Sequence, residues 1–107
     1  MGIRKKKVAG RLQEIISTFL NKESSTQSVV TVTSCDVSSD LKNVTAYLTV
    51  FPESFEAEAL EFAKRKRSEL RSLFADKMPM KVIPFVEFEI DAGEKNRQRI
   101  DQIFEKI

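Results

Sequence analysis

The chain has 107 residues, a length that fits one domain, and its apolar fraction of 41% is enough for one modest core. Lysines and arginines outnumber aspartates and glutamates by only 18 to 16, so any attraction to a polyanion must come from how the charges are distributed. With no histidine and a single cysteine, the chain cannot form a His-based catalytic triad, a Cys-rich metal site or an internal disulfide. We therefore predict a protein without catalytic activity, metal, cofactor or small-molecule substrate.

The N-terminal region is basic but has no recognisable targeting segment. Arg4 to Lys7 are followed by an amphipathic stretch, where a signal peptide would have an unbroken apolar one. No apolar run is long enough to span a bilayer. We therefore expect a cytoplasmic protein that does not contact membranes. The single cysteine, the absence of histidine and the full set of apolar stripes also predict a monomer.

Residues 4–22 have the spacing of an amphipathic helix. Apolar side chains recur every three or four positions, which places them on one helical face: Val8, Leu12, Ile15, Ile16, Phe19 and Leu20. Residues 21–28 are polar, and their serines and threonine favour local bonds to the backbone over continuation of the helix. We therefore expect a loop after residue 22.

Residues 29–37 and 44–51 predict an antiparallel hairpin. Both segments are rich in valine and threonine, which suit a pleated, half-buried surface. The first segment alternates Val30 and Val32 with threonines. The second alternates four apolar side chains with polar or aromatic ones: Val44, Ala46, Leu48 and Val50. Residues 38–43 between the two segments are typical of a turn.

A helical segment from about Ser54 to Lys77 follows Pro52, which ends the second strand. Its apolar stripe is interrupted, because residues 64–69 contain no apolar side chain. A continuous helix that faces a core should place an apolar side chain near positions 66 and 67. We therefore expect the helix to kink there, or to lift off the sheet and present a basic face to solvent.

The last part of the chain predicts one more strand and a possible further helix. Within residues 80–90, Val86, Phe88 and Ile90 alternate with glutamates, and Pro84 indicates an edge position or a bulge because it lacks an N–H. Residues 94–107 have the apolar spacing of a C-terminal helix. The order α-β-β-α-α-β predicts a two-layer α+β domain that spans residues 1–107.

Two basic clusters are the candidate binding sites, since both could contact phosphates. The N-terminal cluster, which includes the basic end at residues 1–7, consists of Arg4, Lys5, Lys6, Lys7 and Arg11. The second cluster consists of Lys64, Arg65, Lys66, Arg67 and Arg71. The alternative for the first is a frayed, solubilising start, and for the second a solvated face neutralised by Glu61 and Glu69. Four consecutive residues cover a full helical turn, so residues 64–67 cannot all face one partner.

Other residues with functional chemistry fit structural roles better. Cys35 lies within a strand pattern and suits a small core position. The carboxylates that could act as acids, bases or metal ligands have no supporting spacing: Asp36, Asp40, Asp91 and Glu94. Tyr47 and Phe85 could stack on bases if exposed, but we expect them to pack.

The hairpin resembles a known family. Val32 to Leu41 (VTSCDVSSDL), followed by residues 46–50 (AYLTV), are similar to the "V-x-x-V-x-V-S-x-D-L…A-x-V-Y-V" signature of ribosome-binding factor A. Residues 70–91, with LRSLF, KM, VIP, Phe88 and Asp91, resemble its "I-R-S-L-L-x-K…P-x-L-x-F-x-x-D". Residues 7–9 (KVA) and 99–100 (RI) resemble its terminal motifs. The resemblance covers nearly the whole chain.

The resemblance implies a type II KH-like domain of a bacterial small-subunit assembly factor. Such a protein binds the immature small ribosomal subunit and its rRNA and assists late rRNA processing and subunit maturation, without a cofactor. This chain departs from the family pattern at Lys66-Arg67-Ser68, where the family has an Ala-x-Gly kink. Residues 23–28 replace the family's Asp-Pro-Arg loop, and Arg97 replaces a glycine. The alternative is a protein–protein module that uses the hairpin or an edge strand to pair with a partner.

Overall fold

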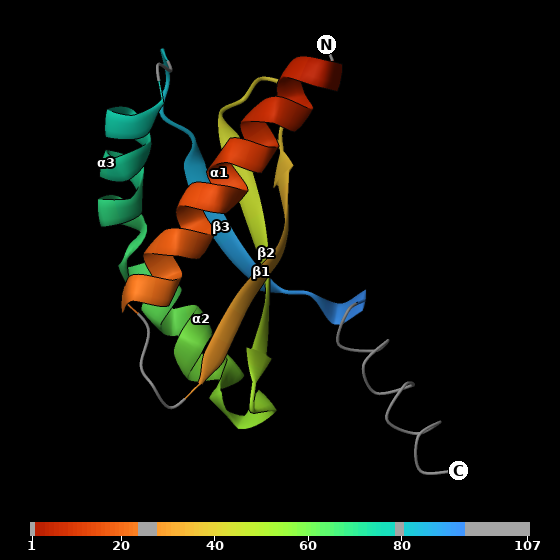
Figure 1. Ribbon diagram of the computed structural model, residues 1–107, viewed down its shortest axis with the longest axis vertical. Helices are drawn as coiled ribbons and strands as arrows, with labels where there is room; N and C mark the ends of the chain where they lie inside the picture. Colours follow the sequence, from red (N-terminus) through yellow and green to blue (C-terminus); the bar gives the residue numbers. More distant parts are fainter. Residues whose placement is uncertain (1, 24–27, 79–80, 94–107) are drawn as a thin grey trace.

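The computed structural model describes residues 2–23, 28–78 and 81–93 of the chain. Its elements follow the predicted order (Figure 1) and have these bounds: α1 (Gly2–Glu23), β1 (Val29–Val37), β2 (Asn43–Phe51), a short 3-10 helix η1 (Glu53–Phe55), α2 (Glu56–Arg65), α3 (Arg67–Lys77) and β3 (Phe85–Ile90). The predicted C-terminal helix at 94–107 lies outside the described residues.

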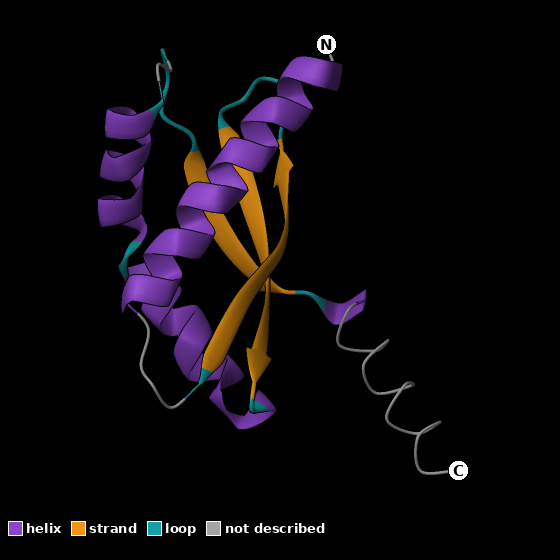
Figure 2. Cartoon of the chain, viewed as in Figure 1, coloured by secondary structure: helices purple, strands orange, loops and turns teal. Residues whose placement is uncertain are grey.

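The three strands form one sheet in the order β1-β2-β3. The hairpin prediction is confirmed, because β1 pairs antiparallel with β2. The chain then crosses through α2 and α3 to β3, which pairs parallel with β2. Helices and strands form two layers (Figure 2), so β1 and β3 are the two edges of the sheet.

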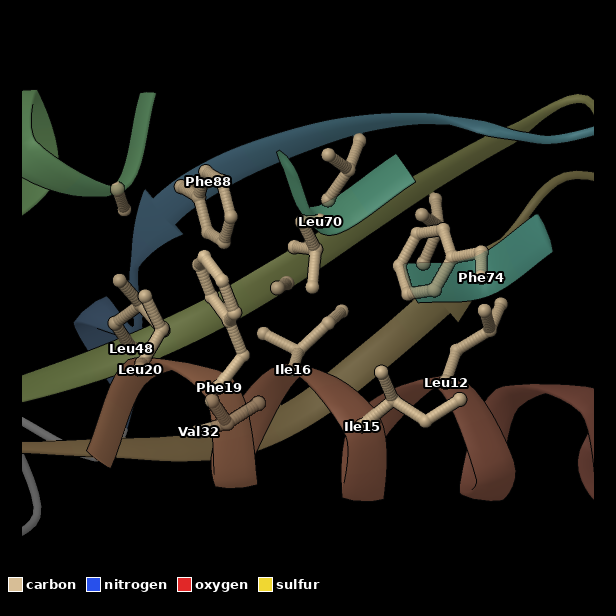
Figure 3. Packing of buried hydrophobic residues seen from close by; sticks show 14 of the residues in the cluster. Leu12, Ile15, Ile16, Phe19, Leu20, Val32, Leu48, Leu70, Phe74 and Phe88 are labelled. Atoms are coloured by element: carbon tan, nitrogen blue, oxygen red, sulfur yellow. The ribbon is translucent and has the colours of Figure 1, made fainter. Parts of the chain in front are cut away.

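The core lies between the helices and the inward face of the sheet (Figure 3). The α1 stripe contributes Leu12 and Ile16, both fully buried, and these pack with Leu70 and Phe74 of α3. The alternation predicted for β2 is confirmed, because its four apolar residues are all buried: Val44, Ala46, Leu48 and Val50. No buried polar or charged residue occurs in the part of the chain that the structure describes.

A β-bulge at Thr33 changes the face that β1 presents to the core. Val32 pairs with Leu48, but the next pair along the ladder joins Ser34 to Tyr47, so Thr33 is the extra residue. Val32 and Val37 are therefore both buried although they are five positions apart. A regular strand would have turned one of them to solvent, because successive side chains alternate between the faces.

The hairpin turn is held by the short polar side chains of residues 38–43. The Asp40 carboxylate accepts hydrogen bonds from the Ser38 hydroxyl at 2.6 Å and from the Lys42 amide at 3.0 Å. The Ser38 hydroxyl oxygen also accepts one from the Asn43 amide at 3.1 Å. Leu41 has a φ of 61°, a conformation that is uncommon for such a residue, and its half-buried side chain packs against the core.

The predicted break in the long helix is confirmed and lies at Lys66. This residue has φ −93° and ψ 5°, and it separates α2 from α3 as the short loop visible in Figure 2. Its side chain and that of Arg67 are only half-buried, although the two stand where the apolar stripe would have continued. Long aliphatic stems can cover part of an apolar surface while their charged ends reach solvent, which explains why these positions hold cations.

The third strand is shorter than predicted, since β3 begins at Phe85 and not at residue 80. Pro84 cannot donate to a ladder, and the carbonyls of Ile83 and Pro84 accept hydrogen bonds from the Arg71 guanidinium. The segment before Phe85 is therefore bonded to α3 instead of β2. The prediction that Pro84 marks an edge is confirmed, because β3 lies at the edge of the sheet.

Candidate RNA-binding surface

The N-terminal basic cluster lies at the start of α1. Lys6, Lys7 and Arg11 are exposed, and the Arg11 guanidinium forms an ion pair with Glu14 at 3.2 Å. Arg4 and Lys5 lie in the first turns of the same helix, but their side chains are outside the described part. This cluster therefore offers at least two lysine ammonium groups to solvent.

The second cluster lies at the other end of α1 (Figure 1). One groove between α1 and α3 is lined by Arg11, Lys22, Glu69 and Lys77, which shows that the two helices lie side by side along their length. Lys6 and Lys22 are separated by sixteen steps along α1, which span roughly 24 Å of helix at 1.5 Å per residue. The structure therefore does not bring the two predicted clusters together into one site.

The four cations at the helix break fall into two pairs. Lys64 and Arg65 are exposed, and their side chains form no ion pair within the described residues. The Lys66 ammonium lies 3.3 Å from the Glu69 carboxylate and 5.9 Å from the centroid of the Phe62 ring. Arg67 donates to the Lys64 carbonyl at 3.1 Å and to Glu87 at 3.0 Å. Only Lys64 and Arg65 are thus available to an external anion without loss of an internal contact.

Arg71 joins α3 to the chain that enters β3. Its Nε donates to the Pro84 carbonyl at 3.3 Å and its Nη2 to the Ile83 carbonyl at 3.1 Å. The guanidinium carbon also lies 4.3 Å from the centroid of the Phe85 ring, a cation–π distance. The Arg71 N–H groups that face these carbonyls already donate to them. The contacts of Arg71 therefore indicate a structural role.

Phe85 is the aromatic residue whose environment differs from the prediction. It is 59% exposed, so the expectation that it packs and is not exposed is wrong, whereas Tyr47 is half-buried. The alternation of β3 carried the relevant signal: Phe85 has the same parity as Glu87 and Glu89, which face solvent, and the opposite parity to Val86 and Phe88, which are buried.

The remaining candidates do not converge on a catalytic or metal site. Burial raises the pKa of the Cys35 thiol to about 12, which keeps it protonated and unreactive at neutral pH. Asp36 is exposed on β1, and Asp91 accepts a hydrogen bond from the Thr33 hydroxyl. Glu94 lies outside the described residues. Within the described ranges, no group of three histidine, cysteine or carboxylate side chains could hold a metal ion.

The helices that the structure describes include none with the length and apolarity needed to cross a membrane. The longest, α1, has one apolar face and carries lysines and arginines along its length. The described surface has two separate groups of exposed cations, one at the start of α1 and one at the α2–α3 break. Such groups can bind phosphates and position a polyanion.

Comparison with known proteins identifies the family. The family model for ribosome-binding factor A matches residues 4–104. A ribosome-binding factor A from Chlorobaculum parvum is 30% identical over 111 residues, which cover 100% of this chain and 92% of the relative.

Solved structures share the fold. The crystal structure of ribosome-binding factor A from Thermus thermophilus has a TM-score of 0.72 and 22% identity, and the match covers 80% of this chain and 93% of that one. A homology model of the Thermus thermophilus protein, fitted into the cryo-EM map of a 30S complex of that protein, has a TM-score of 0.66 and 22% identity over 76% of this chain and 88% of that one. These neighbours confirm the KH-like α+β fold. The chain belongs to the ribosome-binding factor A family.

Proposed function

We propose that this protein binds the immature small ribosomal subunit through its rRNA and assists the late processing and maturation of that RNA. Membership of the ribosome-binding factor A family carries the proposal. It is supported by the Thermus thermophilus relative, a homology model of which was fitted into the cryo-EM map of its 30S complex. The exposed cations at the α2–α3 break supply the matching chemistry on this chain.

Lys64 and Arg65 are the leading phosphate contacts in this proposal. They are adjacent, exposed and without an ion-pair partner among the described residues, so they can approach a phosphate without giving up an internal bond. Two neighbouring cations repel each other in the free protein, and a bound polyanion would offset that cost. Lys66 and Arg67 act behind them, since their contacts with Glu69 and Glu87 fix the geometry of the break.

The N-terminal cluster supplies a second, separate contact. Lys6 and Lys7 lie at the far end of α1 from the α2–α3 break. A short single strand that follows one groove would not reach both groups, whereas a folded RNA with phosphates on two helices could. The separation therefore favours structured RNA as the ligand, and non-base contacts as the main source of affinity.

Gradient sedimentation of a cell lysate tests this function. The tagged protein should follow free small subunits or their precursors, and little of it should follow translating ribosomes. A variant with Lys64 and Arg65 changed to serine should shift toward the top of the gradient, while a control with Glu58 changed to serine should not. Equal occupancy of free small subunits and polysomes would contradict an assembly role.

A further inference from the structure

Phe85 lies on the face of the sheet that none of the described helices covers. It begins β3 and is 59% exposed. Val86 and Phe88 are buried in the core between the helices and the sheet, and their parity directs the Phe85 side chain to the opposite face. The helices form one layer and the sheet the other (Figure 2), so this side chain stands on the outside of the sheet layer.

Arg71 holds one face of the Phe85 ring and leaves the other open. The guanidinium carbon lies 4.3 Å from the ring centroid, and its nitrogens donate to the carbonyls of Ile83 and Pro84. The Phe85 amide donates to the Lys42 carbonyl at 2.9 Å. Both the ring and its backbone are therefore held in place within the free protein. A ring that has one face covered and is still 59% exposed must present its other face to solvent.

Polar and cationic side chains surround this open face. Asn43 pairs with Phe85 in the ladder between β2 and β3, so the two side chains lie next to each other on the same face of the sheet. The Asn43 backbone amide bonds to Ser38, but its exposed carboxamide makes no hydrogen bond within the described residues, which leaves a donor and an acceptor free. The neighbouring Lys42 is exposed, and so is Lys81, four residues before Phe85.

Two carboxylates lie near Phe85, and both have contacts within the protein. Glu87, the next residue on the same face of β3, forms an ion pair with Arg67 at 3.0 Å. Asp40 in the hairpin turn accepts a hydrogen bond from the Lys42 amide at 3.0 Å. The two lysines and the guanidinium beside the ring exceed the one carboxylate there that no ion pair neutralises among the described residues. A phosphate next to the ring therefore meets a net positive charge.

We propose that Phe85 binds one unpaired base of the RNA by stacking, a contact that rests on the proposed function and adds a base contact to the phosphate contacts. The base lies on the open face of the ring, and the Asn43 carboxamide bonds to its edge, as in other proteins that recognise unpaired bases. Stacking accepts any base, since every base has a flat π-face. Further along this side of the sheet, the exposed Asp36 and Glu89 repel phosphates, which confines the contact to the Phe85 end.

The same surroundings argue against a protein partner at this site. Among the described residues, the large exposed apolar side chains are Val29, Phe51, Val82 and Phe85. Val29 and Phe51 pair with each other at the far end of the hairpin from its turn, so only Val82 remains near Phe85. A stable protein interface buries roughly 800 Å² on each side, and charged residues are depleted at its centre. Two apolar side chains among cations do not fit that description.

Fluorescence of a Phe85→Trp variant tests the stacking directly. The chain has no tryptophan, so the indole of this variant reports on this site alone. Hexaadenylate at up to millimolar concentration is the probe, and a hexamer with the same sugar–phosphate backbone but no bases is its control. Hexaadenylate should quench the indole emission and the baseless hexamer should not. Phe51→Trp, the same change at the other exposed phenylalanine, should not be quenched by either. No quenching by hexaadenylate, or equal quenching by both hexamers, would overturn the proposal.

Binding to purified small subunits tests the same contact in the complex. Phe85→Leu keeps an apolar side chain but removes the ring, and it should weaken binding about five- to a hundredfold, the usual effect of losing one stacked base. The slope of log affinity against log salt should not change, because no phosphate contact is lost. Val82→Ala is the control and should bind like the unmodified protein. The urea midpoint checks that both variants are folded.

These measurements separate a failure of the base contact from a failure of the proposed function. If Phe85→Leu bound as tightly as the unmodified protein while the change of Lys64 and Arg65 to serine weakened binding, the base contact would be wrong and the proposed function would stand. If the unmodified protein did not bind small subunits at all, the proposed function would be wrong. The hexaadenylate measurement would then still decide whether the ring at residue 85 stacks on a base.

Discussion

Arg67 of α3 and Glu87 of β3 form an ion pair with 3.0 Å between the guanidinium Nη1 and the carboxylate Oε1. Their side chains are 41% and 60% exposed, so the pair contributes at most about 1 kcal/mol to stability. Its main effect is positional, because it turns the end of the Arg67 guanidinium toward Glu87 while Nε donates to the Lys64 carbonyl. The basic run at the helix break is therefore divided in part by a contact with Glu87, a residue that is distant in the sequence.

Leu48 should be a major contributor to the stability of the core. It is fully buried in the central strand, opposite Val32 of β1 and Ile90 of β3. We expect Leu48→Ala to lower the free energy of unfolding by roughly 2–5 kcal/mol, through lost burial and the cavity left behind. Urea unfolding measures this change. Thr49→Ala, on the opposite face of the same strand, should cost less than about 1 kcal/mol. A loss below about 1 kcal/mol for Leu48→Ala would contradict the assigned inward face.

Arg71→Lys should destabilise the protein although it keeps the charge. Lysine cannot bond to the carbonyls of Ile83 and Pro84 and stack on Phe85 at once, because it lacks the planar, forked guanidinium. We expect a loss of about 1–3 kcal/mol in the free energy of unfolding. Hydrogen exchange at the Phe85 amide, which bonds to the Lys42 carbonyl, should quicken as the start of β3 loosens. Arg65→Lys is the matched control, and equal stability of the two variants would exclude this role for Arg71.

Asp40 should make stability depend on pH in the acid range. Its pKa lies below the usual 3.8, first because the Ser38 hydroxyl donates to the carboxylate and second because the Lys42 amide does. A lowered folded-state pKa stabilises the fold above the unfolded-state pKa, and this contribution is lost as the pH falls through the folded-state pKa. Asp40→Asn should therefore lower the urea midpoint at neutral pH. The difference between the two proteins should shrink below about pH 3.8. A difference that stays constant into this acid range would rule out the linkage.

Much of the fold follows from local patterns in the sequence. The α1 stripe, the alternation in β2 and the missing apolar positions near Lys66 each reflect a periodicity that a single element imposes on its own residues. The bulge at Thr33 could not be predicted in this way. Valine and threonine suit either face of a strand, and the choice between them depends on the pairing with Tyr47 and Leu48. The late start of β3 similarly depends on Arg71, which is thirteen residues away from Pro84.

The residues of the candidate site could be predicted from the sequence. Their division into free cations and cations bonded within the protein could not. Lysine and arginine clusters are visible in any sequence, and charge alone does not separate Lys64 from Arg67. What separates them is Glu87, which lies twenty residues beyond Arg67 and reaches it only because the crossover places β3 beside β2. The alternation of β3 was enough to predict that Phe85 is exposed. The position of Arg71 over the Phe85 ring could be seen only in the tertiary structure.

Two double variants can separate phosphate contacts from structural cations at the break. Changing Lys64 and Arg65 to serine should weaken binding to purified small subunits and leave stability nearly unchanged, because neither side chain has an ion-pair partner among the described residues. Each lost phosphate contact should flatten the plot of log affinity against log salt by about 0.7 to 0.9. Changing Lys66 and Arg67 to serine should flatten the plot less. That variant should lose about 1 kcal/mol of stability, since it removes the pairs with Glu69 and Glu87.

Three interpretations of the break differ in which double variant changes the salt slope and which one loses stability. If all four cations served the RNA equally, both double variants would flatten the salt dependence by the same amount and neither would lose stability. If the break were only a solvated face, neither slope would change, and the start of α1 would become the leading contact, with Lys6 and Lys7 as the next pair to replace. The internal contacts of Lys66 and Arg67 predict a third outcome, in which the slope follows Lys64 and Arg65 while stability follows Lys66 and Arg67. The salt slope and the urea midpoint should both be measured on the unmodified protein, the two double variants and the control Glu58→Ser. The two measurements together decide among the three outcomes.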